Sequence, residues 1–128
     1  MELNHLSSQI IDAAITVHKE LGPGLLESVY NSCMLLELEN MGVKTQSEVL
    51  LPVFYRGQKL DGQGFRLDLL IEDQIIVELK SVSKVEPVHK KQLLTYLRLA
   101  DKPLGLLINF NEYLLKNGIT RIINSRQG

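Results

Sequence analysis

The segment from Gly64 to Lys80, GFRLDLLIEDQIIVELK, constrains the fold most, because it places single charged side chains beside two strongly apolar runs. Two strands joined by an acidic turn at residues 72–74 fit this pattern, since branched apolar runs favour strands and a short polar break favours a hairpin turn. Side chains alternate between the two faces of a strand, so Glu78 and Lys80 share a face. The segment therefore predicts a hairpin with an acid and a base on one face of a sheet.

The turn also fixes a cross-strand register. If the hairpin closes symmetrically about Asp73, Leu70 faces Ile76 and Asp68 falls opposite Glu78, because cross-strand partners share a face. Two carboxylates then converge beside the ammonium group of the second strand. Burying three such groups on an apolar sheet costs free energy unless they pair, bind a cation or reach solvent.

Asp68 and Glu78 offer the oxygen ligands that hard divalent cations such as Mg²⁺ prefer, with water and substrate phosphate in the remaining positions. A cation held there lowers the pKa of a bound water and neutralises charge on a phosphate, while Lys80 positions the nucleophile or stabilises the transition state. This pattern predicts a metal-dependent phosphodiester hydrolase. The alternative for Glu78 and Lys80 is a solvated face of an edge hairpin, with a salt bridge of small value.

Two helices are expected before the hairpin. Apolar residues spaced by three and four predict the first from about residue 4 to residue 21, and Gly22-Pro23-Gly24 ends it. The second is expected from about Leu25 to Met41, with Gly42 as its cap. Its predicted core stripe consists of Val29, Cys33 and Leu36. Glu27 lies near its start, where an acid also interacts favourably with the helix dipole without any functional role.

A third helix is expected after the hairpin, because Pro87 suits a first helical turn and Asp101-Lys102-Pro103 suits a stop after Ala100. Leu93, Leu97 and Ala100 form its predicted core stripe. Its polar ridge consists of His89, Gln92 and Tyr96, spaced by three and four. Taken alone, Gln92 and Tyr96 are a surface amide and a half-buried aromatic residue.

Three further strands complete the predicted sheet. Residues 48–55 suit a strand in which Pro52 marks an edge or a bulge. The apolar run LGLLINF, residues 104–110, is typical of a strand covered on both faces, and the helix before it predicts parallel pairing with the strand that ends at Lys80. A last strand is expected at residues 119–124. The order α, α, β, β, β, α, β, β predicts an α/β fold with a mixed sheet.

Composition limits the classes of function. The chain has 128 residues, of which 45% are hydrophobic, which suits one domain spanning residues 1–128. Its formal net charge of -1 does not predict a general nucleic-acid binder, although residues 80–102 hold six basic and two acidic side chains. The low aromatic content, 5%, gives little support to a base-stacking platform.

The same sequence predicts a cytoplasmic protein with no membrane segment. Cys33 is the single cysteine, so no internal disulfide is expected, and the polar start MELNHLSSQ differs from a signal peptide. No apolar run approaches the ~20 residues that cross a bilayer.

Together these motifs resemble the GxxExxY protein family, a branch of the PD-(D/E)XK nuclease superfamily. The naming motif is Gly24-Leu25-Leu26-Glu27-Ser28-Val29-Tyr30, and the core motif is Asp68 followed by Glu78-Leu79-Lys80. Gln92 and Tyr96 match the Q-x-x-x-Y pattern of exonuclease-like members. Several independent motifs occur in the expected order, so the resemblance covers nearly the whole chain.

The resemblance implies a restriction-endonuclease-like αβββαβ core, with an extra N-terminal helix and a C-terminal strand. It implies that Asp68, Glu78 and the Leu79 carbonyl bind Mg²⁺ or Mn²⁺ and that Lys80 is the catalytic lysine. Glu27 would be the helix-borne acid that completes the site, as a further metal ligand and a catalytic residue. Gln92 and Tyr96 would then line the substrate side. The implied activity is hydrolysis of DNA phosphodiester bonds by metal-activated water.

Two alternatives stay open at this point. One is a catalytically silent nuclease-fold module that binds or interacts without turnover, and the other is a nuclease acting on RNA. A chain of this length has few insertions with which to grip a duplex, so it would act as a homodimer or with a partner protein.

Overall fold

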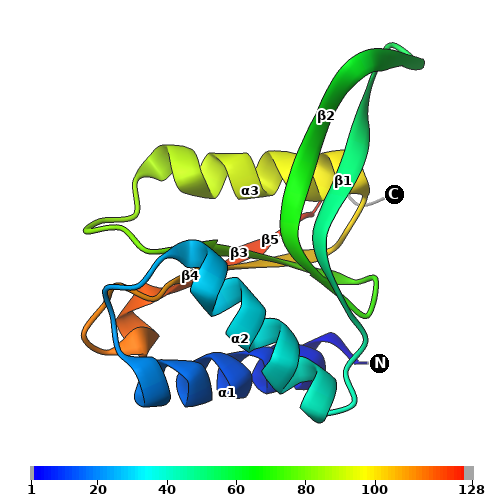
Figure 1. Ribbon diagram of the computed structural model, residues 1–128. Helices are drawn as coiled ribbons and strands as arrows, with labels where there is room; N and C mark the ends of the chain where they lie inside the picture. The colour runs from blue at the N-terminus through cyan, green and yellow to red at the C-terminus, as the bar shows by residue number, and fades with distance from the viewer. Residues whose placement is uncertain (1, 126–128) are drawn as a thin grey trace.

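The computed structural model describes residues 2–125 as a five-stranded mixed sheet with helices on both faces (Figure 1). The strand order is β1-β2-β3-β4-β5, in which β3 and β4 are parallel and the other neighbours are antiparallel. The elements, in chain order, are α1 (Leu3–Leu21), α2 (Glu27–Asn40), β1 (Thr45–Tyr55), β2 (Gln58–Ile71), β3 (Ile75–Lys80), α3 (Pro87–Ala100), β4 (Leu104–Asn109), the 3-10 helix η1 (Leu115–Gly118) and β5 (Ile119–Ile123).

This order confirms the predicted α/β class. The αβββαβ core of a restriction-endonuclease-like fold runs from α2 to β4, with α1 as the extra N-terminal helix and β5 as the extra strand. The predicted parallel crossover is also present, because α3 connects β3 to β4. None of the helices within residues 2–125 combines the length and the apolar character needed to span a membrane.

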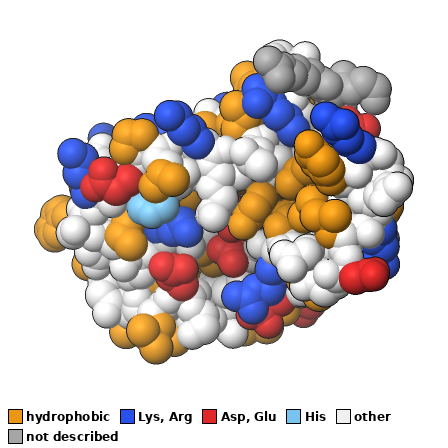
Figure 2. All heavy atoms as spheres, turned by 90° about the horizontal axis from the view of Figure 1, so that it is seen from above, with side chains coloured by type: hydrophobic (Ala, Val, Ile, Leu, Met, Phe, Trp, Pro, Cys, Tyr) orange, Lys and Arg blue, Asp and Glu red, His pale blue; other side chains and the backbone are white. Residues whose placement is uncertain are grey.

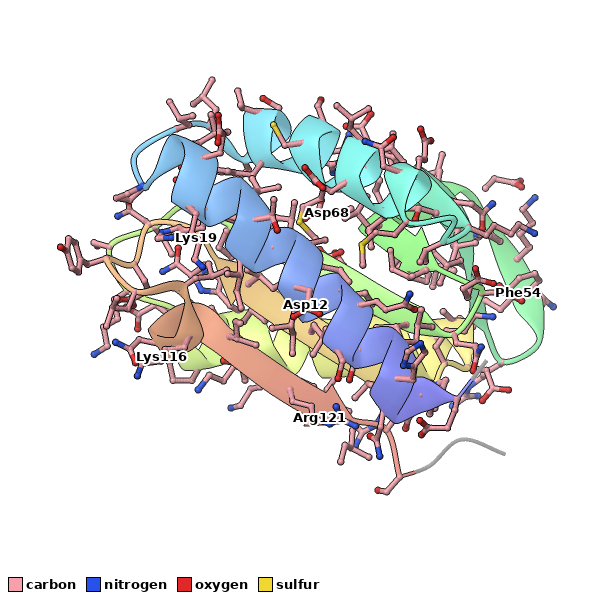
Figure 3. The ribbon with its side chains drawn as sticks, turned by 90° about the horizontal axis from the view of Figure 1, so that it is seen from below. Asp12, Lys19, Phe54, Asp68, Lys116 and Arg121 are labelled. Atoms are coloured by element: carbon pink, nitrogen blue, oxygen red, sulfur yellow. The ribbon has the colours of Figure 1, made fainter. Side chains whose placement is uncertain are left out.

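Two apolar clusters hold the helices on the sheet. On one face α1 and α2 cover the sheet with side chains such as Ile10 and Met34, which pack with Val77 and Leu79 of β3. On the other face Leu93 and Leu97 of α3 pack with Leu70, Ile76 and Leu107. The view from below shows α1 crossing the sheet beside α2 (Figure 3). Consecutive residues of β3 therefore serve opposite cores, as the alternation of a strand requires.

The predicted core stripe of α2 is wrong. Val29 and Leu36 are exposed, by 39% and 60%, and Cys33 is only partly buried. The buried residues are Tyr30, Met34 and Leu38, spaced by four. Apolar residues lie on all sides of this helix, so its own periodicity does not choose a face. Tertiary contacts decide, because the Tyr30 ring stacks on Phe110 at 4.4 Å between centroids.

The first strand differs from its predicted extent but not in character. It begins at Thr45, three residues earlier than expected, since residues 45–47 already pair with β2. Pro52 lies in an edge strand, as predicted, and the register shifts between Pro52 and Phe54. Both explanations offered for this proline therefore apply, because a residue without an N–H weakens a ladder least at an edge and at a bulge.

The β1–β2 hairpin changes direction at Glu48 and Asp68, which lie opposite one another. Leu69 packs with α1 and α2, whereas Leu67, two residues away, packs with α3. Such residues share a face in a regular strand, so the alternation breaks at Asp68. Glu48 has φ 53°, a left-handed conformation that is rare for a residue with a side chain. Beyond this bend, residues 49–67 form a hairpin arm that rises past α3 and out of the body of the molecule (Figure 1).

Candidate active site

The two central strands separate where the predicted acids lie. β2 and β3 pair at Ile71–Ile75, Leu70–Ile76 and Leu69–Val77, which confirms the register predicted from the turn. The next position places Asp68 opposite Glu78, and the backbone ladder stops there. β3 continues from Glu78 to Lys80 in contact with β4 alone. The candidate site lies in this split of the sheet.

The two carboxylates bridge the split through the backbone. Glu78 Oε2 accepts a hydrogen bond from the Asp68 amide at 2.8 Å, and Asp68 Oδ2 accepts one from the Leu79 amide at 2.8 Å. Among the described residues, no donor reaches Asp68 Oδ1 or Glu78 Oε1. Each acid therefore uses one oxygen to hold the strands together and leaves the other for a ligand.

The Leu79 carbonyl faces the same gap. The Leu79 amide points towards β2, because it donates to Asp68. In an antiparallel ladder the N–H and C=O groups of one residue point to the same neighbouring strand. This pattern directs the carbonyl of Leu79 towards β2, the strand that carries Asp68.

Burial and mutual repulsion perturb both acids. Glu78 is 6% exposed, and burial together with the charge of Asp68 raises its pKa to about 8. Burial also raises the pKa of Asp68, although the Leu79 amide and the charge of Lys80 oppose this shift. Lys80 offsets this only in part, so the pKa of each acid stays raised, and each acid keeps one oxygen without a donor among the described residues. The donor set fits a hard divalent cation, which favours carboxylate and carbonyl oxygens.

Lys80 ends β3 beside the acids. The Phe110 amide donates to its backbone carbonyl at 2.9 Å, which fixes the end of the strand. Its ammonium charge lowers the pKa of both Asp68 and Glu78, so it lies within electrostatic reach of each. Within the described part of the chain, Lys80 forms no salt bridge. The ammonium group is therefore available to a bound phosphate.

Glu27 approaches the site from the first residue of α2. It is exposed, and its negative charge raises the pKa of both Asp68 and Glu78. Together with Asp68 and Arg66 it lines a cavity of about 110 Å³, whose other lining residues are Ser28, Asn31 and Glu48. No three His, Cys, Asp or Glu side chains in the described ranges are grouped closely enough to hold a metal ion. Glu27 is thus at the wall of the site, and the converging pair is Asp68 with Glu78.

Tyr30 explains how the loop before α2 is held. Its hydroxyl donates to the Gly22 carbonyl at 2.6 Å and accepts from the Leu25 amide at 3.1 Å. Gly24, between them, has φ 99°, which a residue with a side chain adopts only with strain. The tyrosine therefore closes the loop that delivers Glu27 to the site. Sequence reasoning gave Tyr30 no such role, because its partners precede it in a loop.

The two predicted residues of α3 differ in their contacts. Burial and the charges of Glu78 and Asp68 raise the pKa of Tyr96, so its phenol group lies near the acids and stays protonated. The Tyr96 ring packs against Phe65 of the hairpin arm at 5.0 Å between centroids. Gln92 is exposed and makes no hydrogen bond with the described residues. The structure therefore brings Tyr96 to the acids and leaves Gln92 on the outer surface of the helix.

Two asparagines that sequence reasoning missed support the site. Asn109 is fully buried, and its Oδ1 accepts from the amides of Val82 and Asn111 while its Nδ2 donates to the Val82 carbonyl at 2.9 Å. It therefore secures the chain just after Lys80. An amide inside the apolar run LGLLINF was a usable signal. Asn31 donates to the Asp68 carbonyl at 3.3 Å, and nothing in its neighbourhood of the sequence indicates that contact.

Comparison of the sequence and structure with known proteins identifies the family of this chain. The crystal structure of SSO0001 is similar to 75% of this chain at 25% identity, with a TM-score of 0.48. The matched region is 48% of that chain, so the present chain spans about half of its length. No curated protein matches the chain. The family description that does match, PD-(D/E)XK nuclease superfamily, covers residues 4–122. The chain therefore belongs to the PD-(D/E)XK nuclease superfamily.

Proposed function

We propose that the protein is a metal-dependent nuclease that hydrolyses phosphodiester bonds in DNA with Mg²⁺ or Mn²⁺. The observation that carries the proposal is the pair of acids at the split between β2 and β3, each with one oxygen bound to backbone and one left open. Membership of the PD-(D/E)XK nuclease superfamily supports a divalent-metal nuclease as the reaction class.

Asp68, Glu78 and the Leu79 carbonyl are the groups that would hold the cation. When bound, such an ion supplies positive charge that activates water and balances charge on the phosphate. Glu27 stands at the cavity wall, where its carboxylate would orient the water that attacks the phosphate. The strand or helix that carries each of these groups holds it in place, so the groups would keep the cation and the water in a fixed geometry.

Lys80 and Tyr96 would act on the phosphate itself. The Lys80 ammonium lies beside both acids without a salt bridge among the described residues, so it can stabilise charge that develops on a phosphate oxygen. The raised pKa of Tyr96 keeps a proton on its hydroxyl, which can then donate to the same group. Gln92, one turn earlier on α3, would contact the nucleic-acid backbone from the exposed side.

The test is cleavage of labelled single-stranded and double-stranded DNA with Mg²⁺ or Mn²⁺, comparing the wild type with Asp68→Ala and Lys80→Ala. We expect each substitution to lower the rate by about a hundredfold or more, since each removes charge stabilisation in the transition state. Lys19→Ala, at an exposed lysine on α1 outside the basic segment of residues 80–102, is the matched control and should cleave like the wild type. Equal cleavage by all four proteins would assign the activity to a contaminant or to another site.

One observation favours a second candidate, a nuclease-fold module that binds without turnover. Only two acids converge in the described structure, since no cluster of three His, Cys, Asp or Glu side chains was found there. Calorimetry separates the candidates. Mg²⁺ binding that is lost in Glu78→Gln supports the enzyme, and no Mg²⁺ affinity near neutral pH supports the module. RNA oligonucleotides in the cleavage assay test the remaining choice of substrate.

We further infer that the chain belongs to the GxxExxY branch of the superfamily. Support comes from the geometry of the naming motif, in which Gly24 permits the turn, Glu27 borders the site and Tyr30 closes the loop. Tyr30→Phe should reduce cleavage by loosening Glu27, whereas Tyr113→Phe, at an exposed tyrosine, should not. Unchanged cleavage in Tyr30→Phe would show that the Tyr30 hydroxyl is not needed to position Glu27.

A further inference from the structure

We propose that the hairpin arm, residues 49–67, is a nucleic-acid-binding arm whose tip stacks on an unpaired base of the substrate. The nature of the ligand rests on the proposed function. The location of the binding surface rests on the shape, exposure, charge and backbone geometry of the arm itself. Phe65 and Leu67, near the root of the arm, belong to the core cluster on α3, whereas Phe54 and Tyr55 at the tip are exposed.

The arm presents apolar side chains that the body of the protein does not cover. Phe54 and Tyr55, next to one another at its tip, are 56% and 63% exposed, and Leu50 is 73% exposed. Phe54 lies at the outer end of the hairpin, well away from Asp68 (Figure 3). The chain holds only seven Phe and Tyr residues, and three of them, Phe54, Tyr55 and Phe65, are in the arm. Its few aromatic side chains are therefore concentrated on this element.

The arm carries a net positive charge, although the chain as a whole is slightly negative. It carries three basic residues, Arg56, Lys59 and Arg66, against the single acid Asp61, whereas the whole chain has a net charge of -1. Viewed from above, hydrophobic side chains gather on the side of the molecule where the arm lies, bordered by Lys and Arg side chains (Figure 2). Aromatic rings combined with positive charge suit a nucleic acid, which offers flat bases and phosphates.

The turn at the tip points to a function for Arg56. Arg56 and Gly57 have φ 51° and 79°, and Tyr55 pairs with Gln58, so the hairpin closes through a two-residue turn with both central residues left-handed. Asn or Gly usually occupies the first of these positions, because other side chains are strained there. The Arg56 guanidinium nevertheless lies over the Tyr55 ring, 5.6 Å from its centroid. Both flat groups are thus presented together at the end of the arm.

A groove on the arm continues this surface. Its volume is about 390 Å³, and its lining includes Leu50, Pro52, Leu60 and the Lys59 side chain. Gly64 also lines it, and a Cβ atom there would lie 2.9 Å from the Leu51 carbonyl oxygen. Glycine therefore allows the two strands to stay close beneath the groove. An apolar floor with a lysine at its rim suits a base and its phosphate.

The arm also leads into the candidate active site. Asp68 stands at its root, and Arg66, two residues along, lines the same cavity as Asp68 and Glu27. At about 3.3 Å per residue, the eleven residues from Asp68 to Gly57 span at most ~36 Å. That length is close to one turn of duplex DNA. A strand bound at the site can therefore follow the arm to its tip.

The experiment measures binding in EDTA, where metal-dependent cleavage cannot occur. The probes are a single-stranded DNA 20-mer with one 2-aminopurine, moved along the sequence in a series, and a blunt 20-base-pair duplex. We expect Phe54→Ala and Tyr55→Ala to weaken binding of the single strand about 5- to 100-fold, as loss of a stacked base predicts. In the wild type, 2-aminopurine fluorescence should be quenched at one position of the series, and Tyr55→Ala should abolish that quenching.

Arg56→Asn separates function from folding. Asn-Gly is the favoured pair for this turn, so the variant should unfold at the same temperature as the wild type or higher, yet bind the single strand more weakly. Tyr113→Ala and Lys116→Ala are matched controls, because Tyr113 is 87% exposed in the loop after β4 and Lys116 is exposed in η1, at the other end of the molecule from Phe54 (Figure 3). Both controls should bind the probes like the wild type.

Wild-type affinity in Tyr55→Ala and Arg56→Asn would overturn the proposal. So would arm variants that change the sedimentation of the protein but not its affinity for DNA, because the arm would then be a contact between two copies of the chain. A different result would reject the nuclease proposal. Arm-dependent binding without any cleavage in Mg²⁺ or Mn²⁺ would keep the binding arm and reject the enzyme.

Discussion

Glu78 is the residue whose protonation most affects folding, because it is buried beside a second acid. Its folded pKa is about 8, compared with an ordinary value of 4.5. Between these values the folded state binds more protons than the unfolded state, so stability is lost as pH rises from about 4.5 through about 8. The shift of Asp68 has the same direction and adds to this loss.

Glu78→Gln should therefore remove most of this pH dependence. We expect the wild type in EDTA to lose roughly 2–4 kcal/mol of unfolding free energy between pH 5 and pH 8, and the variant to lose much less. Urea unfolding at the two pH values measures the difference. Glu39→Gln, at an exposed position, is the control and should behave like the wild type. A variant with the wild-type pH dependence would show that Glu78 is ionised throughout.

At the residue scale, the sequence predicted the acids and their register because a three-residue turn fixes which residues face each other. The Leu70–Ile76 pair was correct for that reason. The break of alternation at Asp68 was not predicted, since it depends on the packing of Leu67 against α3 and of Leu69 against the other helices. Local patterns contain no information about which helix covers which end of a strand.

At the scale of elements, the bend in the hairpin depends on one strained residue. Glu48 has φ 53° in β1, directly opposite Asp68. Its side chain lies 3.9 Å from Arg66, but both groups are about two-thirds exposed, so this ion pair contributes little to stability. The backbone conformation at position 48, rather than the charge of the side chain, therefore determines how much a residue there lowers the free energy of unfolding.

Glu48→Gly and Glu48→Ala isolate that cost, because both remove the carboxylate. Only glycine adopts a positive φ without steric penalty, so we expect Glu48→Gly to be more stable than Glu48→Ala by roughly 0.5–1 kcal/mol. Urea unfolding of the two variants measures the difference. As a control, the same pair of substitutions at Gln46, a neighbouring exposed strand residue, should favour alanine. Higher stability of Glu48→Ala would show that the bend imposes no left-handed strain.

Most elements were predictable because their signals are local. Pro87 and the apolar spacing of α3 place that helix, and Gly42, with φ 75°, follows α2 as expected for a cap. The covered face of α2 was not predictable, since Tyr30 is buried through its contacts with Phe110 and with the loop at Gly22. Those partners come from other parts of the chain, and the spacing of apolar residues in the helix does not reveal them.

At the scale of the whole molecule, metal binding should stabilise the fold. An ion that binds only the folded state adds about 2.7 kcal/mol at a hundred times its dissociation constant. We expect the midpoint of thermal unfolding to rise with Mg²⁺ or Mn²⁺ in the wild type and to stay constant in Asp68→Asn. Affinity should increase with pH towards about 8, because the cation must displace the proton that Glu78 holds below that value.

Differential scanning fluorimetry in EDTA and in a metal titration measures this effect. Asp12→Asn, on α1, is a suitable control because it removes an exposed carboxylate from another part of the molecule (Figure 3). An equal rise in Asp68→Asn and in the wild type would place the bound ion elsewhere.

The split between β2 and β3 has a consequence for how such proteins change over generations. Asp68 and Glu78 fasten the two strands through the amides of Asp68 and Leu79, in addition to any work on a substrate. Replacing either acid with an apolar side chain would leave a buried amide without a partner and weaken the contact between β2 and β3. Selection for folding alone would accept an uncharged acceptor such as Gln or Asn at either position, because the buried carboxylates cost stability as pH rises. Acids kept at both positions in a relative would therefore indicate that their negative charge is used, since the strand contacts alone do not require it.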